Sequence, residues 1–343
     1  MRHVVAFALS LLGIVGMQMA AAAQQPPDSS QKIWLNVVVT NKSGKPVQGL
    51  AQSDFVVMDD RHPSPIVAFH APEASAPETV DASTEVILIL DEVNATFDQV
   101  NFGRDGIVKF LTENHGNLTH PTTLGFFAES GLQLQTQPSV DGNAMAAAIQ
   151  QQAQGLRILG RAEQERLKRS QDAIDDLIAR ERNKPGRKLV VWVSPGWPLL
   201  SQRRDDLIPK QQQEVFNSVV KLNTELRLAQ ITLYSADPLR GGGGGERTVF
   251  YQNFTKGLAK PNGAEFGDLG LQVLAEQTGG RAIFGSDAMA KMIDECVQEI
   301  EGTYSLAIMP APGEGKVQFH GVEVRVEKQG LKVRSRDGYY TFP

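Results

Sequence analysis

An uninterrupted apolar run from Val86 to Leu90, ending at Asp91, constrains the fold of this chain more than any other feature of its sequence. A run without polar alternation is typical of a central strand in a parallel sheet, because helices cover both of its faces. Val100, Ile107 and Leu111 then recur at the spacing of one helix face. The sequence therefore predicts a strand followed by a helix, the basic unit of an α/β fold.

The same alternation continues through residue 302. We expect further strands at Thr123–Phe127, Leu132–Gln137, Leu189–Val193, Ala229–Ser235 and Arg281–Phe284, and further helices at Asn143–Gln151, Arg161–Arg182, Gln211–Leu226, Gly267–Gln277 and Asp287–Glu301. Strands that alternate with helices form a doubly wound, mostly parallel sheet of the Rossmann-like kind. Residues 85–302 are thus expected to form one α/β domain.

The two ends of the chain have a different period. Residues 24–69 contain the alternating positions Ile33, Leu35, Val37 and Val39, and residues 303–343 alternate in the same way, which is typical of half-buried strands. Residues 70–84 are rich in proline and poor in large apolar side chains, as expected of a linker. Because neither β segment can cover its apolar face alone, we expect 303–343 to pack with 33–69 as a small β module.

The N-terminus has the features of a secretion signal. Arg2 and His3 precede an apolar run that ends in Ala21-Ala22-Ala23, the small residues expected before cleavage at Gln24. We expect residues 1–23 to be a signal peptide and the mature protein to be periplasmic or secreted. The alternative is an uncleaved anchor, and contact with a membrane is expected only in that case.

Composition excludes some classes of partner. The chain has 343 residues, 41% hydrophobic and 21% charged, with a net charge of −5. Lysine and arginine are dispersed among acidic residues, so no basic stripe predicts nucleic-acid binding. The single cysteine, Cys296, cannot form an internal disulfide and is expected to be a small buried side chain.

Three segments carry a resemblance to a known family. They are Val37–Leu50 with Asp54-Phe55, Ile89–Asn94, and Tyr304–Leu306 with Val333–Tyr340. Their order resembles the acidobacterial VWFA-related proteins, which are exported and contain a von Willebrand factor type A-like domain. The resemblance covers nearly the whole mature chain and implies that residues 85–302 are the type A-like domain.

Metal-binding members of that wider class use an Asp-x-Ser-x-Ser loop and a second, distant aspartate. Here Val93 and Ala95 occupy the two hydroxyl positions, and Pro195 stands where the second carboxylate is expected. The resemblance therefore implies a degenerate adhesion site, with no metal ion and no cofactor. One alternative is that Asp91 and Asn94 cap the following helix. The other is a rearranged metal site, because Asp91, Asn94, Asp98 and Asp237 all belong to the carboxyl ends of strands.

Enzymatic signatures are weak. Ser194 follows an expected buried strand as a catalytic serine would, but Trp192 replaces the first glycine of a nucleophile elbow. No histidine belongs to a pair with the spacing of a zinc site. The prediction is a non-enzymatic protein, with an exported hydrolase as the third-ranked alternative.

The leading hypothesis is an exported protein-interaction module whose contact surface consists of loops 91–99, 194–205 and 237–256. Trp197 is the expected apolar anchor of that surface, unless it packs under its own loop. A metal-dependent adhesion domain with a rearranged site around Asp91 ranks second. The expected binding residues are Asp91, Asn94, Asp98, Ser194, Trp197 and Asp237, and the expected partner is a protein.

Overall fold

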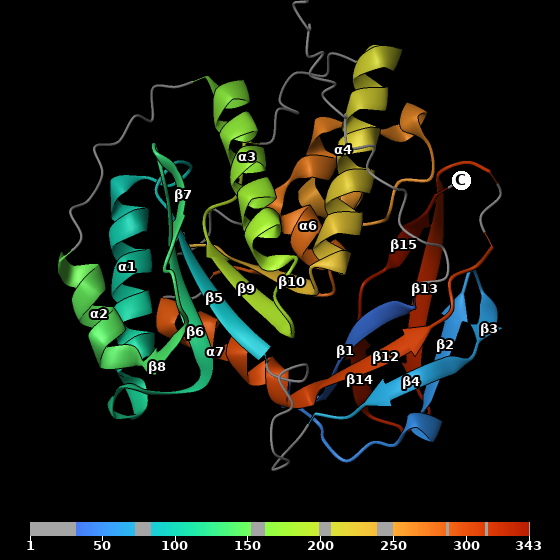
Figure 1. The fold of residues 1–343 in the computed structure, drawn as a ribbon, viewed down its shortest axis with the longest axis horizontal. Helices are drawn as coiled ribbons and strands as arrows, with labels where there is room; N and C mark the ends of the chain where they lie inside the picture. The colour runs from blue at the N-terminus through green and yellow to red at the C-terminus, as the bar shows by residue number, and fades with distance from the viewer. Residues whose placement is uncertain are drawn as a thin grey trace, which may run out of the picture.

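The computed structural model describes residues 32–72, 84–151, 162–198, 207–238, 250–285, 288–312 and 315–342. Over these ranges the chain is a mixed α/β protein with one mostly parallel sheet and two antiparallel sheets (Figure 1). The expected signal peptide lies outside the described residues, as do most of the expected linker and parts of the loops 194–205 and 237–256.

The central sheet has the strand order β11-β10-β9-β5-β6-β7, and β8 pairs with β6. The neighbouring strands β5 and β9 lie at the centre. β6 and β7 follow on the β5 side, and β10 and β11 follow on the β9 side. The strands are β5 (Thr84–Asp91), β6 (Asn117–Ala128), β7 (Gly131–Leu134), β8 (Ser139–Asp141), β9 (Arg187–Val193), β10 (Ile231–Ala236) and β11 (Ala282–Ile283). β7 runs antiparallel to β6, because Ala128 and Gly131 are paired across a tight turn that has no room for a crossover helix.

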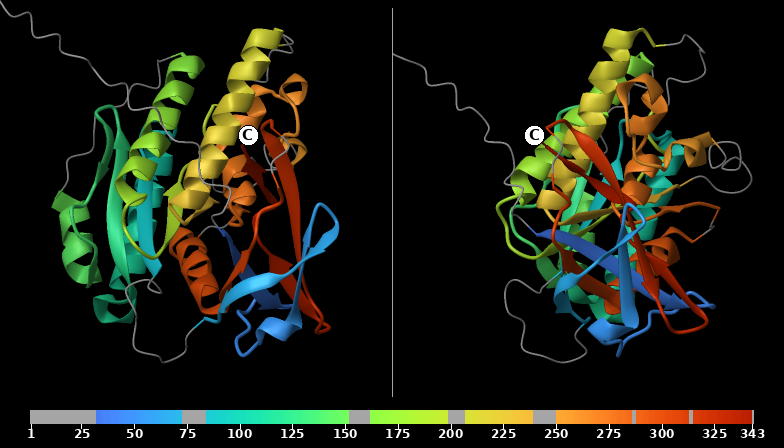
Figure 2. Two further views of the ribbon diagram at one scale, coloured as in Figure 1. Left: turned by 45° about the vertical axis from the view of Figure 1, so that its right-hand side comes forward. Right: turned by 90° about the vertical axis from the view of Figure 1, so that its right-hand side faces the viewer.

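Helices pack on both faces of this sheet (Figures 1 and 2). One face is covered by α3 (Glu163–Glu181), α4 (Pro209–Leu228) and α6 (Leu271–Gln277), and the other by α1 (Phe97–Thr112), α2 (Gly142–Gln151) and α7 (Met289–Gln298). Ile87 and Ile89 of β5 pack toward the first face, whereas Leu88 and Leu90 pack toward the second. This two-sided burial explains the continuous apolar run.

Short 3-10 helices connect several of these elements: η1 (Gln52–Asp54), η2 (Glu113–Gly116), η4 (Gln252–Phe254), η5 (Pro261–Gly263), η6 (Phe266–Leu269) and η7 (Glu299–Gly302). Cys296 of α7 is fully buried in the core, as its position on an apolar helix face predicts. Among the described residues, no helix combines the length and the apolar composition that crossing a membrane takes.

Two four-stranded antiparallel sheets form the β module, in the orders β14-β1-β12-β4 and β15-β13-β2-β3. Its strands are β1 (Ile33–Asn41), β2 (Phe55–Asp59), β3 (His62–Ser64), β4 (Ile66–His70), β12 (Thr303–Ile308), β13 (Gln318–Val326), β14 (Leu331–Arg334) and β15 (Gly338–Thr341). Each sheet combines strands from both ends of the chain: Leu35 of β1 faces Leu306 of β12, and Val57 of β2 faces Val324 of β13. The N-terminal and C-terminal segments therefore share one hydrophobic core.

A buried ionic group connects the β module to the α/β domain. Glu299 of η7 is 5% exposed and accepts hydrogen bonds from Arg281 Nε at 2.9 Å and from the Tyr234 hydroxyl at 2.6 Å. Its carboxylate also pairs with Arg334 of β14, which donates to the Gly279 carbonyl at 2.9 Å. One carboxylate thus joins strand β10, the loop before β11 and strand β14.

Candidate functional site

The carboxyl edge is the edge of the central sheet where β5, β9 and β10 end. Asp91 closes β5, Ser194 follows β9 and Asp237 follows β10. These three strands are parallel neighbours, with Leu90 beside Val193 and Val193 beside Ala236, so their last residues come to the same edge. β5 and β9 also lie where the strand order changes direction, the position at which open α/β sheets bind ligands.

The Asp91 carboxylate is fully buried and bonded by the protein itself. Oδ1 accepts hydrogen bonds from the backbone N–H groups of Val93 at 2.9 Å and Asn94 at 2.8 Å. Oδ2 accepts from Asn94 Nδ2 at 3.0 Å, Ser194 Oγ at 2.8 Å and Trp192 Nε1 at 3.3 Å. Burial raises the pKa of Asp91, and these hydrogen bonds oppose that rise. Both oxygens therefore hold the 92–94 and 194–196 turns against the sheet.

Asn94 extends this network across the face of the sheet. Its Nδ2 also donates to Ser170 Oγ of α3 at 2.9 Å, whereas its Oδ1 is buried without a hydrogen-bond partner among the described residues. Ser194 Oγ accepts a hydrogen bond from Gly196 N at 3.1 Å. Gly196 has φ +101°, and a Cβ there would overlap the Gln272 amide, so the turn after β9 requires glycine.

The capping alternative for Asp91 and Asn94 is wrong. Thr96 is the N-cap of α1: its hydroxyl accepts from Gln99 N, and Gln99 Oε1 accepts from Thr96 N at 2.7 Å. This reciprocal pair satisfies two end groups of the helix without Asp91. Asp98 is exposed in the first turn of α1, outside the group of residues that bond Asp91.

Trp197 does not project from the carboxyl edge as an exposed anchor. Its side chain is 2% exposed and packs edge-to-face against Trp192, with ring centroids 5.5 Å apart. A large aromatic ring gains more from burial in the core than from exposure, so Trp197 packs under its loop. Asp237 is also buried at this edge, and its backbone N–H donates to the Ile283 carbonyl at 3.0 Å.

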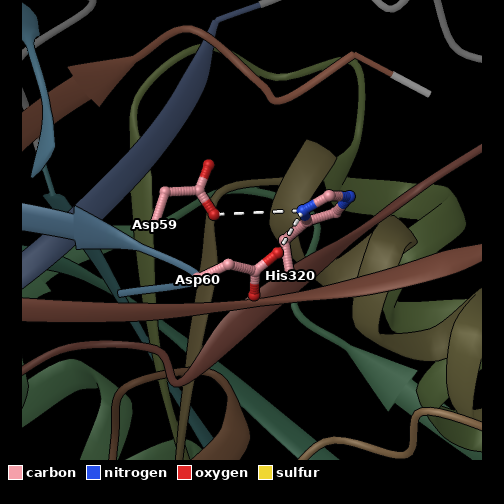
Figure 3. Close-up of side chains that lie close together, drawn as sticks. All are labelled: Asp59, Asp60 and His320. Carbon is pink, nitrogen blue, oxygen red and sulfur yellow. Dashed lines mark hydrogen bonds and ion pairs between the residues drawn. The ribbon is translucent and has the colours of Figure 1, made fainter. Parts of the chain in front are cut away.

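A second cluster of polar residues lies in the β module. Asp59 ends β2, Asp60 lies in the turn to β3, and His320 lies on β13, the strand beside β2. His320 Nδ1 is 2.8 Å from Asp60 Oδ2 and 4.0 Å from Asp59 Oδ1 (Figure 3). The three ligand atoms lie within 4.8 Å of one another, a grouping that suits a metal ion.

Other contacts orient each member of this triad. His320 Nε2 is 3.1 Å from Thr341 Oγ1, and the imidazole stacks on Tyr339 with centroids 5.2 Å apart. Tyr339 donates its hydroxyl to Asp59 Oδ2 at 2.7 Å. Burial raises the pKa of Asp59, while the Tyr339 hydrogen bond and His320 oppose the rise. Burial likewise raises the pKa of the Tyr339 hydroxyl above its usual range.

Sequence reasoning missed this triad. It found no histidine with the spacing of a zinc site and did not single out Asp59 or Asp60. His320 lies 260 positions from Asp60, and strand pairing brings the two together. The available signal was the pairing expected between the two terminal segments, but sequence alone does not determine the register of that pairing.

Comparisons with known proteins identify no family for the chain: no protein-family model and no curated protein matches it. Solved structures with some likeness include proximal thread matrix protein 1 of the mussel byssus, at 9% identity and a TM-score of 0.36, covering 64% of this chain and 49% of that one. Manganese-loaded TRAP of Plasmodium vivax has 9% identity and a TM-score of 0.34, covering 76% and 95%.

The pilus adhesin SpaC of Lactobacillus rhamnosus GG, in its open conformation, has 9% identity and a TM-score of 0.38, covering 86% of this chain and 42% of that one. The chain thus spans less than half the length of the adhesin and about half the length of the mussel protein. TM-scores this low assign no function, so the function has to be inferred from the residues of this chain.

Proposed function

We propose that this chain is an exported, non-enzymatic binding protein that contacts a protein partner through the loops at its carboxyl edge. The observation that carries the proposal is the bonding of Asp91. Its two oxygens accept hydrogen bonds from Val93, Asn94, Ser194 and Trp192, so the carboxylate holds the 92–94 and 194–196 turns. Pre-organised loops on a rigid sheet are a common binding surface.

The sheet order supports a doubly wound, von Willebrand factor type A-like domain. If β5, β6, β7, β9, β10 and β11 are numbered one to six, the sheet reads 3-2-1-4-5-6 from the β7 edge. That is the order of doubly wound folds with a ligand crevice between strands 1 and 4. Asp91 and Ser194 lie at that crevice, and helices on both faces complete the arrangement.

Exposed apolar side chains at the starts of helices α1 and α4 support contact with a protein. Phe97, the first residue of α1, is 55% exposed, and Ile208, which precedes α4, is 58% exposed. Both helices begin at their upper ends in Figure 1, α1 at the left and α4 toward the upper right. Aromatic and aliphatic side chains at such positions are typical centres of protein interfaces, and they replace Trp197 as the proposed anchors.

Replacing both anchors tests the binding surface. The double variant Phe97→Ser, Ile208→Ser is expected to reduce capture of the partner from an exported fraction by about tenfold or more, because each apolar anchor contributes on the order of 1 kcal/mol or more. Quantitative mass spectrometry after crosslinking measures the change. Val140→Ser on β8 is the matched control. Val140 is 54% exposed and lies beside the N-terminal part of β6, away from the ends of the parallel strands. Equal recovery of the same proteins by wild type and double variant would contradict the proposal.

The second candidate function is metal-dependent adhesion at a rearranged Asp91 site. One observation favours it: Asn94 Oδ1, a possible oxygen ligand, is buried beside Asp91 without a hydrogen-bond partner among the described residues. Against it, an ion would have to displace donors that already satisfy the Asp91 carboxylate. Val93 and Ala95 add no side-chain oxygen, and they pack against the core on opposite faces of the sheet.

Thermal unfolding with added ions separates the two functions. We expect millimolar Mg²⁺ or Ca²⁺ to leave the Tm of the wild type nearly unchanged, because tight sites for these ions need several charged oxygen ligands. Asp91→Asn provides the comparison by differential scanning fluorimetry. A rise in Tm that disappears in Asp91→Asn would establish the adhesion-type site instead.

The hydrolase alternative has little support in the geometry. The Ser194 hydroxyl donates to the buried Asp91 carboxylate and accepts from the Gly196 backbone. A nucleophilic serine needs an adjacent base that can take up and release its proton, commonly histidine. Here the hydroxyl serves as a link between two loops, in keeping with the proposed non-enzymatic role.

A further inference from the structure

We propose that Asp59, Asp60 and His320 bind a divalent transition-metal ion, with Zn²⁺ as the best match. The site is in the β module, on a different sheet from the Asp91 network, and does not depend on the function proposed for the carboxyl edge. It joins the hairpin between β2 and β3, from the N-terminal segment, to β13 from the C-terminal segment.

The distances between the proposed ligand atoms suit tetrahedral coordination of a metal ion. Zn²⁺ binds imidazole nitrogen and carboxylate oxygen at about 2.0–2.2 Å, so ligand atoms in a tetrahedral shell lie about 3.3 Å apart. The separations from His320 Nδ1 are 2.8 Å to Asp60 Oδ2 and 4.0 Å to Asp59 Oδ1, which bracket that value. Small side-chain rotations would equalise them. Figure 3 shows both carboxyl groups turned toward the imidazole.

The strongest indication of a ligand is the free oxygen of Asp59. Asp59 is 9% exposed, and its Oδ1 is buried with no hydrogen-bond partner among the described residues. This oxygen faces His320 Nδ1 from a distance too long for a hydrogen bond. A buried carboxylate oxygen without a partner is costly, and a bound cation at this position would satisfy it.

Each proposed ligand residue has two polar atoms. One contacts a neighbouring residue of the protein, and the other is directed toward the proposed ion. Asp59 Oδ2 accepts from the Tyr339 hydroxyl, and Asp60 Oδ1 accepts from the Gly321 backbone N–H at 2.8 Å. His320 Nε2 contacts Thr341 Oγ1. When Nε2–H donates to that hydroxyl, Nδ1 keeps its lone pair for the metal. Such outer partners orient ligands in natural metal sites.

The ligand set and the exposure point to zinc. Imidazole with carboxylates suits Zn²⁺ and related ions, whereas Ca²⁺ and Mg²⁺ prefer shells made of oxygen alone. The Asp60 side chain is 43% exposed, which provides a path from solvent. Three protein ligands leave a fourth position for water or for a group from a partner.

Zinc titration of the purified chain tests the proposal. Wild type is expected to bind one equivalent of Zn²⁺ saturably, with a rise in Tm that grows with zinc concentration. Asp60→Asn is the main variant, because Asp60 is partly exposed and an asparagine can still accept the Gly321 hydrogen bond. It is expected to weaken binding by more than the ~10- to 100-fold that follows loss of an outer partner. His62→Asn is the matched control, since His62 is exposed on the same hairpin, and it is expected to keep the wild-type affinity.

Three further variants make the test more specific. Thr341→Val keeps the shape of the side chain but removes the outer contact of His320, and it is expected to weaken Zn²⁺ binding by about 10- to 100-fold. Asp91→Asn is expected to leave Zn²⁺ binding unchanged, which separates this site from the carboxyl edge. Absence of saturable zinc binding by wild type would overturn the proposal. So would wild-type affinity in Asp60→Asn and Asp59→Asn proteins that circular dichroism shows to be folded.

Discussion

The Asp91→Ala variant is expected to lower the free energy of unfolding by about 3–5 kcal/mol, because it leaves several buried donors without an acceptor. Each unsatisfied buried polar group costs about 1–3 kcal/mol. The Ser194 hydroxyl, the Trp192 indole N–H and the Asn94 amide all lose their bond to the carboxylate. Asp91 is fully buried, so water cannot easily replace these contacts.

Urea denaturation followed by circular dichroism measures this loss. Asp98→Ala is the matched control, because Asp98 is an exposed aspartate seven residues further along the chain and its removal is expected to change stability by less than about 0.5 kcal/mol. If Asp91→Ala is as stable as Asp98→Ala, the carboxylate does not hold the loops, and the proposed function loses its main support.

Removal of the Glu299 carboxylate is expected to have an effect of similar size. Glu299→Ala leaves Arg334 and Arg281 without their shared anion and leaves the Tyr234 hydroxyl without its acceptor. Arg334 is partly buried between the two parts of the molecule. Breaking a buried ion pair on one side costs about 3–5 kcal/mol, mostly from the charge left behind.

The control is Glu301→Ala, because Glu301 is exposed in the same short helix η7. Both variants can be compared by urea denaturation and by hydrogen exchange of β1 and β14. We expect Glu299→Ala to lose protection in these two strands, since Arg334 belongs to β14 and β14 pairs with β1. Unaltered protection there would show that the Glu299 group does not stabilise the β module.

The strands and helices of the central domain could be predicted from sequence, because a strand buried on both faces has apolar residues at consecutive positions. β5 is apolar at consecutive positions, since its alternate residues enter two different cores. The expected helices at Asn143–Gln151 and Gln211–Leu226 agree with α2 and α4 to within two residues at each end. Periodicity did not reveal that β7 turns back on β6, because strand direction depends on the connection and not on the pattern.

The residues of the carboxyl edge show which features could not be predicted from sequence. The loops that begin at Asp91 and Ser194 were expected at one edge of the sheet because they follow parallel strands, and in the structure Asn94 and Ser194 both donate hydrogen bonds to Asp91. The hydrogen bonds of these residues depend on burial, which a sequence does not supply. Trp197 illustrates this most clearly, because an aromatic residue in a loop can be an exposed anchor or a core side chain.

The sequence by itself determined the alternation of strands and helices, the buried central strand and the β character of both terminal segments, because these features depend on local periodicity. Tertiary structure decided which polar atoms meet. The Asp59, Asp60 and His320 triad depends on the register between β2 and β13, and a shift of one residue would turn His320 to the other face. Register follows from the packing of the whole module, so the triad became visible only once the two ends of the chain were paired.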